Sequence, residues 1–159
     1  MAIPESLINE AMRRGIDVVD LISKALNLDP GERSRAHLEL AERFLREGVE
    51  LIDRDPVQAS EKLYKAAEEA IKAIAIALNL DEARIAGDQG RWATTLLFDA
   101  VESVSSRLNN RDVRLWWRAA WFLHVEGFHE ARLKPMHIKE DVEYIEDIVK
   151  LARGVVKAQ

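Results

Sequence analysis

Apolar residues recur at three- and four-residue steps along most of this chain. That spacing places them on one face of an α-helix, whereas a β-strand needs alternation at every second residue. No stretch sustains such alternation, and the β-branched residues are scattered among alanines and leucines. Glycine and proline are sparse, so few residues interrupt the helical pattern. The pattern therefore predicts an all-α protein.

The breaks between apolar stretches predict about six helices. Two helices share one start signal, because Asp29-Pro30-Gly31-Glu32 and Asp55-Pro56-Val57-Gln58 each place a capping side chain before a proline. We expect the short break at the second signal to join antiparallel neighbours. The predicted helices cover residues 4–26, 30–54, 56–79, 91–108, 112–128 and 138–156, and residues 81–90 are predicted as a loop.

We expect one domain over residues 1–159, because this length suits a single hydrophobic core. Residues 30–157 are expected to form an antiparallel up-and-down bundle. Residues 1–28 are expected to add an N-terminal helix that packs on the bundle or on a partner subunit. The helix over residues 56–79 is rich in alanine, which lets neighbouring helices approach closely, so it is expected at the centre.

The amino-acid composition limits the expected cellular compartment and the class of binding partner. The chain has no cysteine, which excludes disulfides, thiolate zinc sites and cysteine nucleophiles and favours a reducing compartment. No apolar run approaches the roughly 20 residues of a membrane span, and the first residues do not resemble a signal peptide, so we expect a cytoplasmic protein. The formal net charge of −5 disfavours specific binding of duplex DNA, although a local basic site is compatible with it.

The predicted helix over residues 112–128 holds the most informative side chains. It is apolar on nearly every side, with Trp117 and His124 on one face and Trp116 on another. A helix of this kind lies at the centre of a bundle or is covered by a second subunit. We expect both, with one face in the core and the Trp116 side partly in a homodimer interface.

The same helix and the residues that follow it contain the candidate binding side chains. Three arginines at helical spacing can pair with neighbouring acids or contact phosphate, and the tryptophans can pack in a core or interface or stack on bases. His124 can equally be a core histidine that is hydrogen-bonded to a neighbour. The candidate binding residues are Arg111, Arg114, Trp117, Trp121, Glu126 and His129.

No motif indicates a metal site, a cofactor or a covalent mechanism. The histidines lack the His-Glu-x-x-His spacing of a zinc helix, and on an α-helix His124 and His129 project in different directions. The glycines of residues 87–90 lack the lysine and the preceding strand of a phosphate-binding loop. A Gly-x-Ser-x-Gly elbow is also missing. We therefore expect neither a metal nor a cofactor.

Two stretches resemble a known family. They are residues 55–73, DPVQASEKLYKAAEEAIKA, and residues 121–130, WFLHVEGFHE. Together they resemble the archaeal PaREP family of small helical proteins, which is itself similar to the HEPN superfamily of helical bundles. The resemblance spans residues 30–153 and implies an up-and-down bundle that is often dimeric.

The resemblance to HEPN proteins also implies a possible activity. Many members are metal-independent RNases that use an arginine and a histidine four to six residues apart, placed in a dimer cleft. Arg118 and His124 are separated by five residues and match this spacing. His124 would assist proton transfer at the ribose 2′-hydroxyl or the leaving oxygen, and Arg118 would stabilise charge on the phosphate. On a straight helix the two side chains point about 120° apart, so they meet only through the arginine's length, a bent end near Gly127 or the second subunit.

Other HEPN members lack the motif and serve as binding or scaffold modules, often with nucleotidyltransferases. Our leading hypothesis is a HEPN-like homodimer without demonstrable catalysis that binds nucleic acid such as RNA, a nucleotide, or a partner protein such as a nucleotidyltransferase. The first alternative is a metal-independent RNase of a toxin or defence system that uses Arg118 and His124 as catalytic residues. The second is a purely structural interaction module in which His124 lies in the core.

Overall fold

Helices form the regular structure of the chain in a computed structural model that describes residues 2–159. The prediction of an all-α fold is confirmed, because these residues contain no strand. The predicted number of six helices is wrong, because the described residues form eight α-helices and one π-helical segment. They are α1 (Glu5–Arg13), α2 (Val18–Ala25), α3 (Pro30–Leu51), α4 (Pro56–Ala77), α5 (Asp81–Gln89), α6 (Thr94–Arg107), α7 (Asp112–Phe122), η1 (Leu123–His129) and α8 (Pro135–Lys157).

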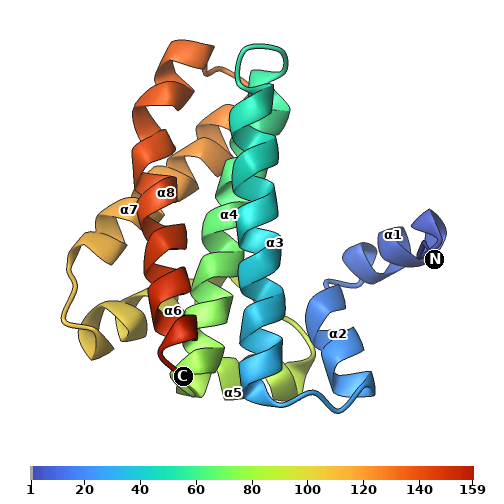
Figure 1. Cartoon of the computed structure of the whole chain (residues 1–159). Helices are drawn as coiled ribbons and strands as arrows, with labels where there is room; N and C mark the ends of the chain where they lie inside the picture. Colours follow the sequence, from blue (N-terminus) through green and yellow to red (C-terminus); the bar gives the residue numbers. More distant parts are fainter. Residues whose placement is uncertain (1) are drawn as a thin grey trace.

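The long helices α3, α4 and α8 form the centre of the molecule (Figure 1). α3 and α4 run antiparallel, and both begin as predicted: Asp29 Oδ1 accepts from the Glu32 N–H at 2.8 Å and Asp55 Oδ1 from the Gln58 N–H at 3.1 Å. α4 is the central helix and contacts α3, α8, α6, α7 and η1. None of the helices within residues 2–159 has the length and apolar character needed to cross a membrane.

The predicted continuous helix over residues 4–26 is wrong, because the chain breaks it into α1 and α2. Gly15 lies between them with φ +70°, a left-handed conformation that favours glycine. Asp17 then starts α2, since its Oδ1 accepts a hydrogen bond from the Asp20 N–H at 3.0 Å. α1 buries none of its residues and extends away from the bundle (Figure 1). An apolar stripe therefore did not indicate burial at this end of the chain.

The predicted loop over residues 81–90 is also wrong, because residues 81–89 form α5. Gly87 lies inside this helix. Gly90 ends it with φ +73°, and its N–H donates to the Ala86 carbonyl at 2.8 Å. A glycine in this conformation is the usual end signal of a helix, so the second glycine marked a boundary instead of a loop.

Charged side chains attach α2 to α3 and α4. His37 of α3 is fully buried, with Nδ1 2.5 Å from Glu69 Oε2 and Nε2 2.7 Å from Asp20 Oδ1. Lys72 Nζ of α4 donates to Asp17 Oδ2 at 2.8 Å. Ser23 is the one buried residue of α2. The contacts that join Asp17 and Asp20 at the start of α2 to the bundle are therefore ionic.

Candidate functional site around His124

The prediction of one α-helix over residues 112–128 is wrong in its second part. α7 ends at Phe122 and the chain continues in the wider π-helical turns of η1. The Glu130 N–H donates to the Val125 carbonyl at 2.8 Å, which is the five-residue step of a π-helix. Segments of this kind are rare and often occur at functional sites.

Gly127 lets η1 lie directly against α4. It is buried, and a Cβ atom at this position would overlap Cβ and Oγ of Ser60. Ser60 Oγ itself donates to the Pro56 carbonyl at 2.8 Å, which holds the hydroxyl at this contact. The absence of a side chain at Gly127 therefore lets η1 bring His124 next to the side chains of α4.

His124 lies between η1 and α4. Its Nδ1 is 2.8 Å from Glu61 Oε2, and its ring stacks on Tyr64 with centroids 4.1 Å apart. The ring centroids of Trp121 and Phe128 lie 5.2 Å and 6.2 Å away. The His124 side chain is 18% exposed, so it combines a fixed orientation with access to solvent.

His129 extends this arrangement to the surface. Its Nε2 lies 3.1 Å from His124 Nε2, and the residue is exposed. The expectation that these histidines project in different directions is wrong, because a π-helical turn brings residues five apart to the same side. In this contact one Nε2 donates and the other accepts. Glu61, His124 and His129, here called the His124 cluster, thus form a continuous chain of hydrogen bonds from α4 to the surface.

The arginines of α7 lie on an adjacent groove. The groove measures about 350 Å³ and is lined mainly by aromatic and charged side chains: Phe98, Asp99, Val101, Glu102, Arg114, Trp117, Arg118 and Trp121. Arg118 is exposed, and no hydrogen bond within residues 2–159 joins it to His124. Trp121 is common to both places, since it lines the groove and packs against the His124 ring.

The other charged candidate residues are exposed or paired with a neighbouring charge. Arg111 is exposed just before α7, and Arg114 Nε donates to Glu102 Oε2 at 2.6 Å. Glu126 pairs with Arg132 Nε, and this hydrogen bond lowers the pKa of the Glu126 carboxyl. These pairs occupy Arg114 and Glu126, whereas no salt bridge within the described chain engages Arg118.

The two candidate tryptophans differ in burial. Trp117 is 5% exposed and packs against Tyr64, with centroids 5.7 Å apart, so it belongs to the core. Trp121 is partly exposed and meets Phe98 edge-to-face at 4.9 Å. Only Trp121 of this pair therefore offers a ring at the surface for a ligand.

Sequence analysis missed Glu61 and Tyr64, the residues of α4 that hold His124. They lie one helical turn apart in the alanine-rich stretch, where they interrupt its apolar pattern. This interruption was the signal in the sequence that could have identified them. Burial raises the pKa of Tyr64, and the neighbouring carboxylates of Glu68 and Glu61 raise it further, so the phenol stays protonated. Nothing local to Glu61 indicates its partner, which lies 63 residues along the chain.

The archaeal PaREP1/PaREP8 family matches residues 36–149, a span that includes most of α3, all of α4 and the whole His124 cluster. The chain belongs to this family. The predicted resemblance to PaREP proteins is therefore confirmed, and α1 and α2 of this PaREP protein lie outside the matched span.

Two solved structures resemble this PaREP protein. One is the crystal structure of a Sulfolobus solfataricus protein, with 39% identity and a TM-score of 0.69, covering 74% of this chain and 96% of that one. The other is a solution structure of the same structural-genomics target, the Orf c02003 protein, with 38% identity and a TM-score of 0.58, covering 78% and 91%. A comparison with curated proteins gave no match.

Proposed function

We propose that this PaREP protein is a HEPN-like homodimer that binds single-stranded RNA across the face formed by α6, α7 and η1. The observation that carries the proposal is the chain of contacts from Glu61 through His124 to the exposed His129, beside a groove that holds Arg118 and Trp121. Arginine suits phosphate, an exposed indole suits a base, and imidazoles can hydrogen-bond to ribose or phosphate oxygens.

Arg118 and Trp121 make the main contacts in this proposal. Arg118 is free of salt bridges within residues 2–159 and lies in the groove, so a phosphate can bind it without displacing an acid. Stacking of a base on an aromatic ring contributes about 1–3 kcal/mol. An RNA strand that stacks on Trp121 also lies close to His124, because the Trp121 and His124 rings pack against each other.

The test measures binding of a fluorescent single-stranded RNA of mixed sequence by anisotropy. Arg118→Ala and Trp121→Ala should each weaken binding about 5- to 100-fold, which corresponds to the loss of about 1–3 kcal/mol. Arg46→Ala, which removes an exposed arginine from α3, is the matched control and should bind like the wild type. Equal affinities for Arg118→Ala and Arg46→Ala would exclude this face and favour a purely structural module.

The hydrogen-bonded histidines favour a second candidate function, which is metal-independent cleavage of the bound RNA. In this candidate function Glu61 orients His124 through Nδ1, and a proton passes between the Nε2 atoms of His124 and His129, which lie 3.1 Å apart. In the cleavage step an imidazole removes the 2′-hydroxyl proton, the 2′-oxygen bonds to phosphorus, and the bond from phosphorus to the 5′-oxygen breaks. The proton then passes to the leaving 5′-oxygen, giving a 2′,3′-cyclic phosphate and a 5′-hydroxyl.

Cleavage is tested with end-labelled RNA in the presence of a chelator. His124→Gln and His129→Gln should each lower the rate by about 100-fold or more, since general acid–base catalysis typically contributes 10²–10⁴-fold. His137→Gln replaces an exposed histidine outside the cluster and should keep the wild-type rate. Cleavage at equal rates in all three variants would come from a contaminant. This result would exclude cleavage by this protein and would not affect the proposal that it binds RNA.

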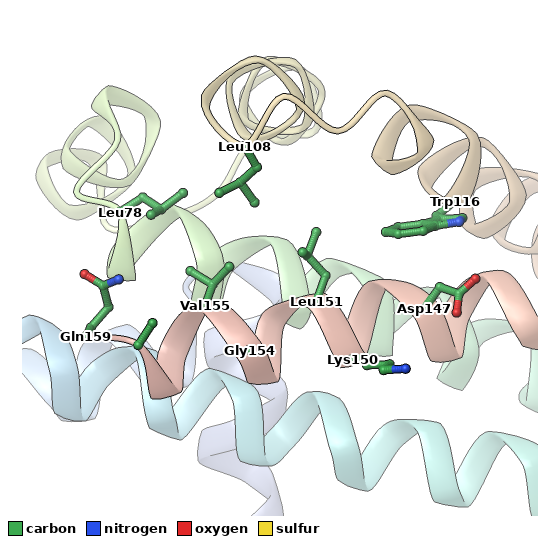
Figure 2. Close-up of a pocket in the computed structure, with 10 residues that line it drawn as sticks. Leu78, Leu108, Trp116, Asp147, Lys150, Leu151, Gly154, Val155 and Gln159 are labelled. Carbon is green, nitrogen blue, oxygen red and sulfur yellow. The ribbon is translucent and has the colours of Figure 1, made fainter.

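The homodimer in this proposal uses an apolar groove along α8 (Figure 2). The groove measures about 610 Å³ and is lined largely by Leu78, Leu108, Trp116, Leu151, Val155 and Ala158. Asp147 and Lys150 lie at its Trp116 end (Figure 2). An acid and a base one turn apart make the surface self-complementary, because a two-fold axis can pair Asp147 of one copy with Lys150 of the other.

The oligomeric state is measured by light scattering after size exclusion. Val155→Glu places a charge in the groove and should convert a dimer to a monomer, because an unpaired buried charge is unfavourable. Val49→Glu on the exposed side of α3 is the matched control, since Val49 is 43% exposed. A wild-type protein that remains monomeric at high concentration would exclude the dimer.

A further inference from the structure

A second cluster of chemically active side chains lies between α2 and α3 and includes none of the residues of the His124 cluster. Carboxylate oxygens of Asp17 and Asp20 and a ring nitrogen of His37 all lie within 4.8 Å of one another. Atoms that each lie about 2.1 Å from a common metal ion are separated by up to about 4.2 Å, so small side-chain movements suffice to bring them together on one ion. Sequence analysis did not single out these residues, because two helices contribute them.

Glu69 orients His37 in the way that metal ligands require. His37 Nδ1 lies 2.5 Å from Glu69 Oε2, and this contact points Nε2 toward Asp20 Oδ1 at 2.7 Å. Metal-binding histidines almost always donate their second ring N–H to a carboxylate or carbonyl, which selects the tautomer and raises the basicity of the ligating nitrogen. Glu69 makes this contact through Nδ1, which leaves Nε2 as the His37 ring nitrogen that faces Asp20.

Both aspartates are also held by other groups. Asp20 Oδ2 accepts a hydrogen bond from Trp92 Nε1 at 2.9 Å, which directs Oδ1 toward His37. Asp17 Oδ2 accepts from Lys72 Nζ at 2.8 Å, and Oδ1 accepts from the Asp20 N–H at 3.0 Å with one lone pair remaining. The two carboxylates therefore lie on the first turn of α2 in fixed orientations.

Among the side chains that these ion pairs join, the acidic groups outnumber the basic ones. The acids are Asp17, Asp20, Glu68 and Glu69, and the bases are His37 and Lys72. With every group ionised, an excess of negative charge lies in a largely buried region, which is unfavourable. A divalent cation at this cluster would reduce this excess and bond directly to the carboxylates.

A cavity of about 580 Å³ reaches the cluster at Asp20. It lies between α2, the start of α3 and the end of α5, and Lys24 and Arg33 also line it. The Arg33 side chain is partly buried, and its Nε has no hydrogen-bond partner within residues 2–159. An anion or water bound at Asp20 would share this cavity with the Arg33 guanidinium.

We propose that Asp17, Asp20 and His37 bind one divalent transition-metal ion, with Zn²⁺ or Mn²⁺ as the best match to one imidazole and two carboxylates. Three protein ligands leave at least one coordination position for a water or an anion, and Asp20 is the ligand that lines the cavity. Catalytic metal sites have this arrangement, whereas structural zinc sites use four protein ligands. The ion also links α2 to α3, since its ligands come from both.

The experiment titrates chelator-treated full-length protein with Zn²⁺ and Mn²⁺ by calorimetry, and with Co²⁺ by visible absorption. The expected result is one equivalent bound and a raised thermal midpoint. Asp20→Asn and Asp17→Asn should weaken binding by about tenfold or more and remove the Co²⁺ absorption bands. Asp88→Asn, an exposed acid that lines the same cavity, is the matched control and should bind like the wild type.

Two results would overturn the proposal. One is the absence of stoichiometric binding by the wild-type protein. The other is binding that survives Asp20→Asn but is lost in His124→Gln, because the ion then occupies the surface histidines. Circular dichroism shows whether the two aspartate variants fold. If either does not, X-ray absorption of the Zn²⁺-loaded wild-type protein identifies the ligands of the ion instead. One nitrogen ligand among oxygens supports the site at His37, and two imidazole ligands exclude it.

Discussion

Two histidines of this protein have opposite surroundings, although each contacts a glutamate of α4. His124 is partly exposed and has one carboxylate and one imidazole as partners, whereas His37 is fully buried between two carboxylates. Burial acts to lower the pKa of His37, but the hydrogen bonds and charges of Asp20 and Glu69 more than offset it and raise the pKa to about 9. In the metal-free protein His37 is therefore a buried imidazolium at neutral pH.

This pKa predicts that the metal-free protein loses stability in mild alkali. A histidine with a folded pKa above its unfolded value of 6.5 stabilises the fold fully below pH 6.5, and the contribution disappears as pH rises through about 9. The expected loss between pH 6 and pH 9.5 is about 3 kcal/mol, from 1.36 kcal/mol per pKa unit. Urea unfolding with a chelator present measures it. His37→Gln should show a much flatter profile, and a flat wild-type profile would contradict the prediction.

Gly127 is the residue on which the contact between η1 and α4 depends most directly. Gly127→Ala should lower the free energy of unfolding by about 1–3 kcal/mol, because the new methyl group overlaps Ser60. Adding Ser60→Gly should recover part of this loss in a double-mutant cycle. Gly87→Ala in α5 is the control, since a Cβ there meets no atom within 4 Å and should stabilise the helix by up to about 1 kcal/mol. Similar effects of the two glycine substitutions would be inconsistent with the close approach.

At the scale of elements, α1 and α2 contribute unequally to the stability of the fold. Deleting residues 2–13 should change the free energy of unfolding by less than about 0.5 kcal/mol, because α1 buries no residue. Deleting residues 2–28 should cost about 3–5 kcal/mol, because His37 and Lys72 then lose the carboxylates of α2. Denaturant unfolding of the two truncations measures the difference. Equal stability of both would show that α2 is not held by its ion pairs.

The incorrect predictions of element type have a common physical cause. α5 contains a glycine that was interpreted as a loop residue, and η1 has a composition that an α-helix could equally adopt. The difference between α- and π-helical turns depends on contacts with another element, here Gly127 against Ser60 and His124 against Glu61. Such contacts are invisible to local patterns. By contrast, the starts of α3 and α4 were predicted because their capping residues lie within the same turn.

At the scale of the whole molecule, the net charge of −5 opposes a polyanion, so RNA binding must depend on a few local cations. With two or three phosphate contacts, the logarithm of the affinity should fall against the logarithm of salt concentration with a slope of about −1.5 to −2. Arg118→Ala should reduce the slope by about 0.7. Anisotropy between 50 and 200 mM salt measures it, and duplex DNA should compete poorly. A slope unchanged by Arg118→Ala would exclude a phosphate contact at this residue.

Local patterns determined the all-α class, the starts of α3 and α4, the central position of the alanine-rich helix and membership of the PaREP family. Each of these depends on residues within a few turns of one another or on a contiguous match. Tertiary structure alone decided that His124 meets Glu61 and that His37 meets Asp20 and Glu69. These partners are 17 to 63 residues apart, so no periodic signal links them. Their chemistry arises only when packed helices bring buried charges together in a low-dielectric interior.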